Sequence, residues 1–354
     1  MGSLSDYGEA ALLNHVFNSA YTSVATLYVA LATATLTDAA TGASMSEVAN
    51  TNAYARTAIT FGAAASRQVQ QSGAVTFPTA SGAWGTITSW AIVDSATYGA
   101  GNVLAYGDFT ASFAPVAGNT PTIPSGEIRV QMLPTQYTAS TIAVTNATTI
   151  TDSANGLPLY PAGSIVYLTG FSGGQAANNN TALTVFSSAV GTMTFTGSSL
   201  VTGAAGPTIT VGLSGGFATT TVHLLLNRMF RNQAYAKPAT YVGLATAVIT
   251  DAAALNTDVT EVSGGNYARK QVNIAGGAVP AWNTASGGVV TNANAVQFNT
   301  PSASWGLVTS CFLIDSASGG GNIIGYDNNS IIDQTPVAND TVLFDIGQFS
   351  NAMS

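Results

Sequence analysis

Charged side chains are scarce in this 354-residue sequence: Asp, Glu, Lys and Arg make up 7% of it, and the formal net charge is −8. An ordinary soluble domain has about 25% charged residues. With two lysines and six arginines, the chain has no basic patch for nucleic acid or for an anionic membrane surface. Its polarity comes from Ser, Thr, Asn and Gly, which cost less to bury than ions do. This composition favours a protein packed against other subunits over a cytosolic enzyme.

Cysteine, histidine and long apolar runs are also nearly absent. Cys311 is the single cysteine, so no intrachain disulfide can form, and we expect it to be a buried apolar thiol. His15 and His223 fall in helical patterns, where we expect them to face solvent, and with one cysteine they are too few for a structural zinc site. No apolar run reaches the roughly 18 residues of a membrane-spanning helix. The N-terminus shows no basic region followed by an apolar core, so no classical signal peptide is predicted.

The sequence contains two related segments. "EVANTNAYAR" at residues 47–56 corresponds to "EVSGGNYAR" at residues 261–269. Longer stretches correspond as well: "LLNHVFNSAY" with "LLNRMFRNQAY", "LYVALATATLTDAA" with "TYVGLATAVITDAA", and "SWAIVDSATYGAGNVLAYG" with "SCFLIDSASGGGNIIGYD". We therefore predict one fold that occurs twice, in domains at residues 1–134 and 217–354.

Each copy begins with a helical pattern and continues in short strands. In the second copy an apolar stripe has helical spacing: Val222, Leu225, Leu226, Met229 and Phe230. In the first copy, "SLSD" at residues 3–6 offers a helix-capping signal. Short β-branched or aromatic runs follow, separated by Gly, Asn, Pro and Ser. Residues 135–216 alternate at period two without a helical stripe. The predicted fold class is mainly β: two homologous antiparallel β-sandwich-like domains, each with an N-terminal helix, flanking a small all-β module.

Eight repeated residues are candidate site residues, and we predict structural roles for all of them: Tyr54, Arg56, Trp84, Asp94, Tyr267, Arg269, Trp305 and Asp315. In so charge-poor a chain each arginine is expected to have a fixed partner, Glu47 for the first copy and Glu261 for the second. Alternation along a strand places the tyrosine and the arginine of each copy on one face. The tryptophans are expected in the core, superposed on one another, and the aspartates are expected to cap backbone N–H groups of Gly-rich turns.

Recognisable catalytic and cofactor motifs are missing from the sequence. There is no G-x-S-x-G, no phosphate-binding G-x-x-x-x-G-K-[ST] and no D-x-[DN]-x-[DN]-G calcium loop. Paired carboxylates are the machinery of glycosidases, but the repeated aspartates precede Gly-rich turns and are better explained as turn formers. We therefore predict no catalytic residue, no cofactor and no metal site.

The segments "LSDYGEAALLNHVF", "ATLYVALATATLTDA", "EVANTNAYARTAITF" and "AVTFPTASGAWGTITSWAIVD" resemble a family of small virion proteins of tailed bacteriophages, commonly labelled tail fibre or minor structural proteins. The resemblance covers both outer copies. The central "GSIVYLTGF" and "NNNTALTVFSSAVGTMTFTG" resemble a β-module that several phage structural proteins carry as an insert.

The resemblance implies a non-enzymatic structural component of the virion, assembled in the host cytoplasm, with a tail- or neck-fibre-type protein exposed on the particle as the favoured form. A capsid decoration (cement) protein is the first alternative. A tail protein that binds or depolymerises host surface polysaccharide is the second.

The expected partners are further copies of the chain and other virion proteins; neither nucleic acid binding nor membrane insertion is expected. Because two domain copies can replace two subunits of a ring, a homo-oligomer is predicted, with three chains the favoured number. The helical segments "LSDYGEAALLNHVF" and "TVHLLLNRMF" are the candidates for subunit contacts, because a thin sandwich is not expected to cover their apolar faces.

Overall fold

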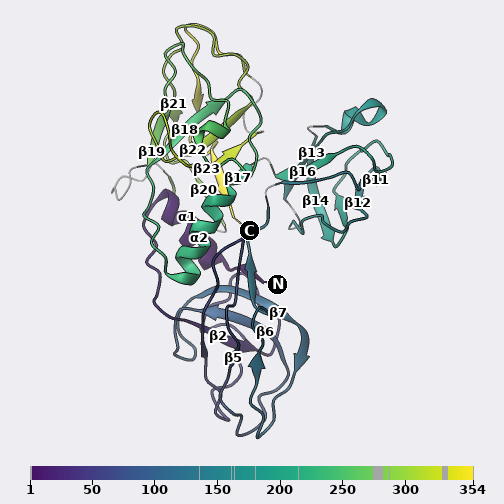
Figure 1. The fold of residues 1–354 in the computed structure, drawn as a ribbon, viewed down its shortest axis with the longest axis vertical. Coiled ribbons are helices and arrows are strands. Elements are labelled where there is room, and N and C mark those ends of the chain that lie inside the picture. Colours follow the sequence, from purple (N-terminus) through teal and green to yellow (C-terminus); the bar gives the residue numbers. More distant parts are fainter. Residues whose placement is uncertain are drawn as a thin grey trace.

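The computed structural model describes residues 2–353 except 135, 161, 163, 180, 214, 274–281, 287 and 329–333. The predicted start of the central module, residue 135, lies outside the described residues. Two β-rich halves lie at opposite ends of the long axis, a third β-rich unit projects from the side, and two helices lie side by side between the halves (Figure 1). The prediction of a mainly β fold is confirmed.

The first half contains β1 (Gly2–Leu4), α1 (Asp6–Phe17), β2 (Leu27–Ala32), β3 (Thr57–Ile59), β4 (Gln68–Gln70), β5 (Val75–Thr76), β6 (Ile87–Val93), β7 (Val103–Phe113), β8 (Thr122–Ile123) and β9 (Arg129–Gln131). The central unit contains β10 (Gln136–Ala139), β11 (Ile142–Asn146), β12 (Thr149–Asp152), β13 (Ile165–Thr169), η1 (Gly173–Asn178), β14 (Ala182–Ala189), β15 (Thr192–Phe195) and β16 (Ile209–Leu213).

The second half contains β17 (Gly215–Phe217), α2 (Thr219–Arg231), β18 (Thr240–Ala245), η2 (Asn256–Asp258), β19 (Lys270–Asn273), β20 (Val289–Thr291), β21 (Val296–Gln297), β22 (Ser310–Ile314), β23 (Ile323–Asp327), β24 (Leu343–Phe344) and β25 (Ser350–Ala352).

The two halves arrange equivalent strands in the same order. The first sheet has the order β3-β2-β6-β7-β1-β9-β4, and the second, read from its β19 edge, has the order β19-β18-β22-β23-β17. The antiparallel pairs β4–β9 and β5–β8 recur as β20–β25 and β21–β24. β17 begins at Gly215, before the domain boundary expected at residue 217. The boundaries of the domains stay a prediction.

The central unit has its own sheet and its own core. Its strands form one sheet of order β10-β16-β13-β14-β15-β12-β11. Alternate residues of these strands are buried, as in Val166 and Leu168 of β13 and Ile209 and Val211 of β16. Period-two alternation therefore predicts which side of each strand is buried.

The helix α1 starts where the capping signal predicts it. Ser5 has extended backbone angles, and its side-chain oxygen accepts a hydrogen bond from the Gly8 N–H at 3.1 Å. Asp6 lies in the first turn, where its negative charge complements the helix dipole. The helix α2 ends at its C-cap residue Asn232, which adopts a left-handed backbone conformation.

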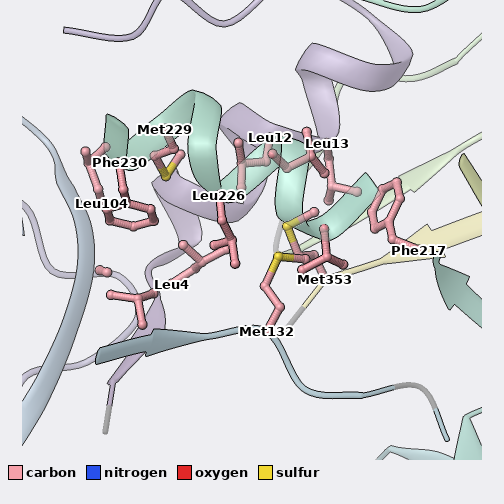
Figure 2. Close-up of a cluster of buried hydrophobic side chains, with 14 of the residues drawn as sticks. Leu4, Leu12, Leu13, Leu104, Met132, Phe217, Leu226, Met229, Phe230 and Met353 are labelled. Atoms are coloured by element: carbon pink, nitrogen blue, oxygen red, sulfur yellow. The ribbon is translucent and has the colours of Figure 1, made fainter. Parts of the chain in front are cut away.

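The apolar faces of α1 and α2 are buried within the chain. Leu12 and Leu13 of α1 lie in one cluster with Leu226, Met229 and Phe230 of α2 (Figure 2). The same cluster includes residues of both outer sheets. The prediction that these apolar faces make contacts between subunits is wrong, because the other half of the same chain already covers them.

The prediction that His15 faces solvent is also wrong. Its side chain is buried in α1, and its Nδ1 accepts a hydrogen bond from the Tyr21 N–H at 3.0 Å. Burial and the nearby positive charge of Arg228 lower the pKa of His15 to about 4. His223 is half-buried, and its Nε2 accepts a hydrogen bond from the Arg67 N–H at 3.0 Å. The His223 ring is therefore held by a hydrogen bond between the two halves, and the His15 ring by one within its own half.

Candidate functional site

Glu47, Tyr54 and Arg56 form a cluster that we call the first clasp. The Arg56 guanidinium donates to both carboxylate oxygens of Glu47, from Nε and from Nη2, at 2.8 Å each. The Tyr54 hydroxyl donates to Glu47 Oε1 at 2.9 Å and accepts from the Leu31 N–H at 2.9 Å. The side chains of Arg56 and Glu47 are 1% and 3% exposed. Burial raises the pKa of Tyr54 above its ordinary value, so this hydroxyl keeps its proton.

The remaining donors of Arg56 bind backbone carbonyls. Nη1 donates to the carbonyl oxygens of Ser95 and Ala100 at 2.9 and 2.8 Å, and Nη2 donates to that of Gly42 at 3.3 Å. With the two bonds to Glu47, these contacts use all five N–H donors of a guanidinium. The first clasp therefore ties loops of its own half together and leaves Arg56 no donor for a ligand.

Glu261, Tyr267 and Arg269 form the second clasp, which repeats the first. Arg269 donates to both oxygens of Glu261 at 2.8 and 2.7 Å, and the Tyr267 hydroxyl donates to Oε1 at 2.9 Å. Nη1 of Arg269 donates to the Ser316 carbonyl at 2.9 Å. The hydrogen bonds to Glu261 raise the pKa of Arg269. The Glu261 side chain is 21% exposed, so water reaches the second clasp more easily than the first.

Asp94 and Asp315 close the loops that the clasps hold. One carboxylate oxygen of Asp94 accepts from the Asn102 N–H and the other accepts from its side-chain amide, both at 2.7 Å. Asp315 binds Asn322 in the same two ways, also at 2.7 Å. Both aspartates therefore cap a backbone N–H of a Gly-rich turn, and both carboxylates are engaged in the turn itself.

Trp84 and Trp305 lie in the core beside the tyrosines of the clasps. Their exposed fractions are 5% and 4%. Each ring meets its tyrosine edge-on, with centroids 5.3 Å apart for Tyr54–Trp84 and for Tyr267–Trp305. The indole N–H groups donate to the carbonyls of Asn52 at 2.9 Å and Gly265 at 2.8 Å. Neither tryptophan is placed as a stacking platform for a sugar.

The structure provides no nucleophile at Cys311. The residue is fully buried in β22, as predicted, and burial raises the pKa of its thiol well above the ordinary value. A reactive cysteine needs an exposed and stabilised thiolate. Among the described residues, no group of three or more His, Cys, Asp or Glu side chains is placed to hold a metal ion. None of the described helices combines the length and apolar character that crossing a membrane requires.

A hollow of about 700 Å³ lies in the second half, lined in part by Leu244, Val308, Gln334, Asp340 and Phe344. Asp340 is the acid among its described lining residues, and it accepts a hydrogen bond from the Val337 N–H at 2.8 Å, which makes it a turn former. Glycoside hydrolysis uses a pair of carboxylates. The described lining of this hollow does not supply such a pair.

Arg67 makes contacts between distant segments that no sequence pattern predicted. Its backbone has a positive φ of 59°, whereas the residue at the equivalent turn of the second half, before β20, is Gly288 with φ 67°. Its guanidinium donates to the carbonyls of Leu133 at 3.2 Å and Phe217 at 3.1 Å, on the two sides of the central unit. Its Nη1 also lies 3.9 Å from Oδ1 of Asp251. Two of its partners are backbone carbonyls, which any residue type can supply, and Asp251 lies far away in the sequence. No local motif therefore marks Arg67.

The chain matches the sequence model of a family described as "Podophage GP4 fiber I protein gp80", over residues 3–131 and again over residues 216–351. The chain belongs to this phage fibre family. The two matched ranges fall on the two halves that carry the clasps, and the central unit lies between them. No curated protein matches the chain. Membership in the fibre family assigns the protein a structural role in a tailed-phage virion and associates it with other virion components.

Proposed function

We propose that the protein is a non-enzymatic fibre-type component of the tail or neck, exposed on the virion. The observation that carries this proposal is the double match to the fibre family, over both halves of the chain. The arrangement of the halves fits the role, because they lie at opposite ends of an elongated molecule with the helices between them (Figure 1).

The hydrogen bonds of the polar side chains support a structural role for the tyrosines, arginines and aspartates among the candidate residues. In each clasp the arginine and the tyrosine both donate to the glutamate, and the aspartates bind their own turns. A catalytic group needs a free proton position or lone pair that faces a substrate. The clasps instead satisfy their groups internally, as expected of residues with a structural role.

We also propose that the protein forms a homo-oligomer, with three chains the favoured number, and that it binds other virion proteins. The low charge supports this, because the centres of protein interfaces are depleted in charged residues. The contacts must come from surfaces other than the buried faces of α1 and α2. Light scattering of the purified protein, and of virion fragments that contain it, measures the number of chains.

The position in the virion is tested by labelling. A short epitope inserted at the β14–β15 hairpin, beside the 69% exposed Val190, leaves both clasps and both helices unchanged. Gold-labelled antibody should then mark the tail or neck of intact phage particles. Label spread over the capsid would replace the proposal by the cement alternative. Saturable depolymerisation of host capsule by the purified protein would show that the non-enzymatic proposal is wrong.

A further inference from the structure

We infer that the chain is a fused dimer: α1 and α2 form a pseudo-two-fold interface in which the helix of each half completes the core of the other half. The partner that fits the apolar face of each helix is a second copy of the same fold, and this chain supplies that copy itself. The inference does not depend on where the protein sits in the virion.

Reciprocal hydrogen bonds cross the interface. Asn14 of α1 accepts from the Ala285 N–H of the second half at 3.0 Å, and Asn227 of α2 accepts from the Ala64 N–H of the first half at 2.9 Å. The two asparagines occupy the same place in the repeated "LLN" motif, and the two alanines lie equally far before β5 and β21. Exchanging the two halves therefore converts the Asn14–Ala285 contact into the Asn227–Ala64 contact.

The aromatic contacts obey the same exchange. Phe17, near the end of α1, packs on Trp282 of the second half with centroids 4.4 Å apart. Phe230, its counterpart in α2, packs on Phe61 of the first half, with ring centroids 5.1 Å apart. Trp282 and Phe61 lie equally far before β21 and β5, so they are counterparts too.

A third pair of contacts uses different side chains at equivalent places. The ring of His15 in α1 packs on the ring of Tyr235 in the second half, with centroids 5.4 Å apart. Its counterpart in α2, Arg228, donates from Nη2 to the carbonyl of Tyr21 in the first half at 2.9 Å. Three pairs of exchanged contacts are the signature of an isologous interface, in which residue i contacts j and j contacts i.

The interface predicts a crossed effect of substitution, which we would measure by hydrogen–deuterium exchange on the full-length protein. Asn14→Ala lies in the first half but should accelerate exchange in β20 and β25 of the second half, by roughly tenfold. Asn227→Ala should do the same to β4 and β9 of the first half. Phe17→Ala and Phe230→Ala should produce the same crossed pattern with larger amplitude.

Asn119→Ala is the matched control. Its side chain accepts from the Val116 N–H at 3.0 Å, wholly within the first half, so its effect should stay in that half. Slow exchange retained in β6 and β22, interior strands of the two outer sheets, shows that the variants keep their fold. The inference is overturned if Asn14→Ala and Asn227→Ala each affect only the half that carries the substitution. Asn14→Ala removes one acceptor only, so it decides the question even if Phe17→Ala unfolds the protein.

Discussion

The two halves of the chain have the same side chains in their clasps and only partly the same ones where the halves meet. Glu47, Tyr54 and Arg56 reappear as the same residue types in the second clasp, with hydrogen bonds that agree to about 0.1 Å. At the interface, in contrast, the position of His15 in α1 is taken by Arg228 in α2. A clasp satisfies its groups within one half, so each copy needs the complete set.

The interface differs from the clasps, because each of its contacts joins residues from different halves. Phe17 pairs with Trp282, whereas its counterpart Phe230 pairs with Phe61. A change on one helix can be matched by a change in the opposite half, without any change to the counterpart contact. A fused dimer is therefore free to become asymmetric at its interface while its two folds stay alike.

The largest effect is expected in the core, where the halves are most alike. Trp84→Ala and Trp305→Ala should each lower the free energy of unfolding by about 3–5 kcal/mol, since each removes a buried ring and leaves a cavity. Denaturant unfolding monitored by circular dichroism measures both losses. Two unequal losses, with one below about 1 kcal/mol, would show that one of the tryptophans is not a core residue.

The clasps should differ in how much they contribute. Arg56→Ala leaves Glu47 buried without its cation, which should cost about 3 kcal/mol. Arg269→Ala should cost less, about 1–2 kcal/mol, because Glu261 is 21% exposed and water can solvate it. Thermal unfolding of both variants, with Arg56→Lys and Arg269→Lys as charge-preserving controls, measures the difference. Equal losses would contradict the role assigned to solvent access.

Arg67 is expected to fix the central unit and to contribute little to overall stability. Arg67→Gly introduces the residue that the second half has at this turn and relieves about 1 kcal/mol of backbone strain. It also removes the hydrogen bonds to Leu133 and Phe217. We expect a net change within about 2 kcal/mol, but faster hydrogen exchange in β10 and β17. Exchange that stays as slow as in the unsubstituted protein would refute this role.

Glu9 should make stability depend on pH in the direction opposite to most carboxylates. Burial and the nearby carboxylates of Asp38 and Asp6 raise its pKa to about 8, from an ordinary value of 4.5. The folded chain therefore holds the proton of the Glu9 carboxyl more tightly than the unfolded chain does. The stability that this protonated carboxyl contributes is lost as the pH rises from 4.5 to 8. The counterpart residue in α2 is the buried Val222, so an uncharged side chain suits this position.

Glu9→Gln should remove that fall and make the protein more stable than the unsubstituted chain above pH 8. Urea unfolding at pH 5, 7 and 9 measures the effect, and Glu127→Gln, at an exposed glutamate, is the control. The same pH dependence with and without Glu9 would show that another group titrates.

Much of the candidate site followed from local sequence. The repeated "YAR" and its upstream glutamate predict the clasps, since a scarce buried cation needs a partner close by and both copies supply one. The aspartates before Gly-rich turns predict their own capping bonds for the same reason, because the groups they bind lie within eight residues along the chain.

The helices show what the sequence left open. An apolar stripe determines that a helix face is buried, but not which surface buries it, and we assigned α1 and α2 to contacts between subunits. The tertiary structure places them against each other, and the same packing buries His15 and gives Arg67 its partners across 150 residues. The β fold, its recurrence and the clasps could be predicted from the sequence, because they depend on spacing within a segment. How the halves meet could not be predicted in this way, because it depends on which distant apolar surfaces fit together.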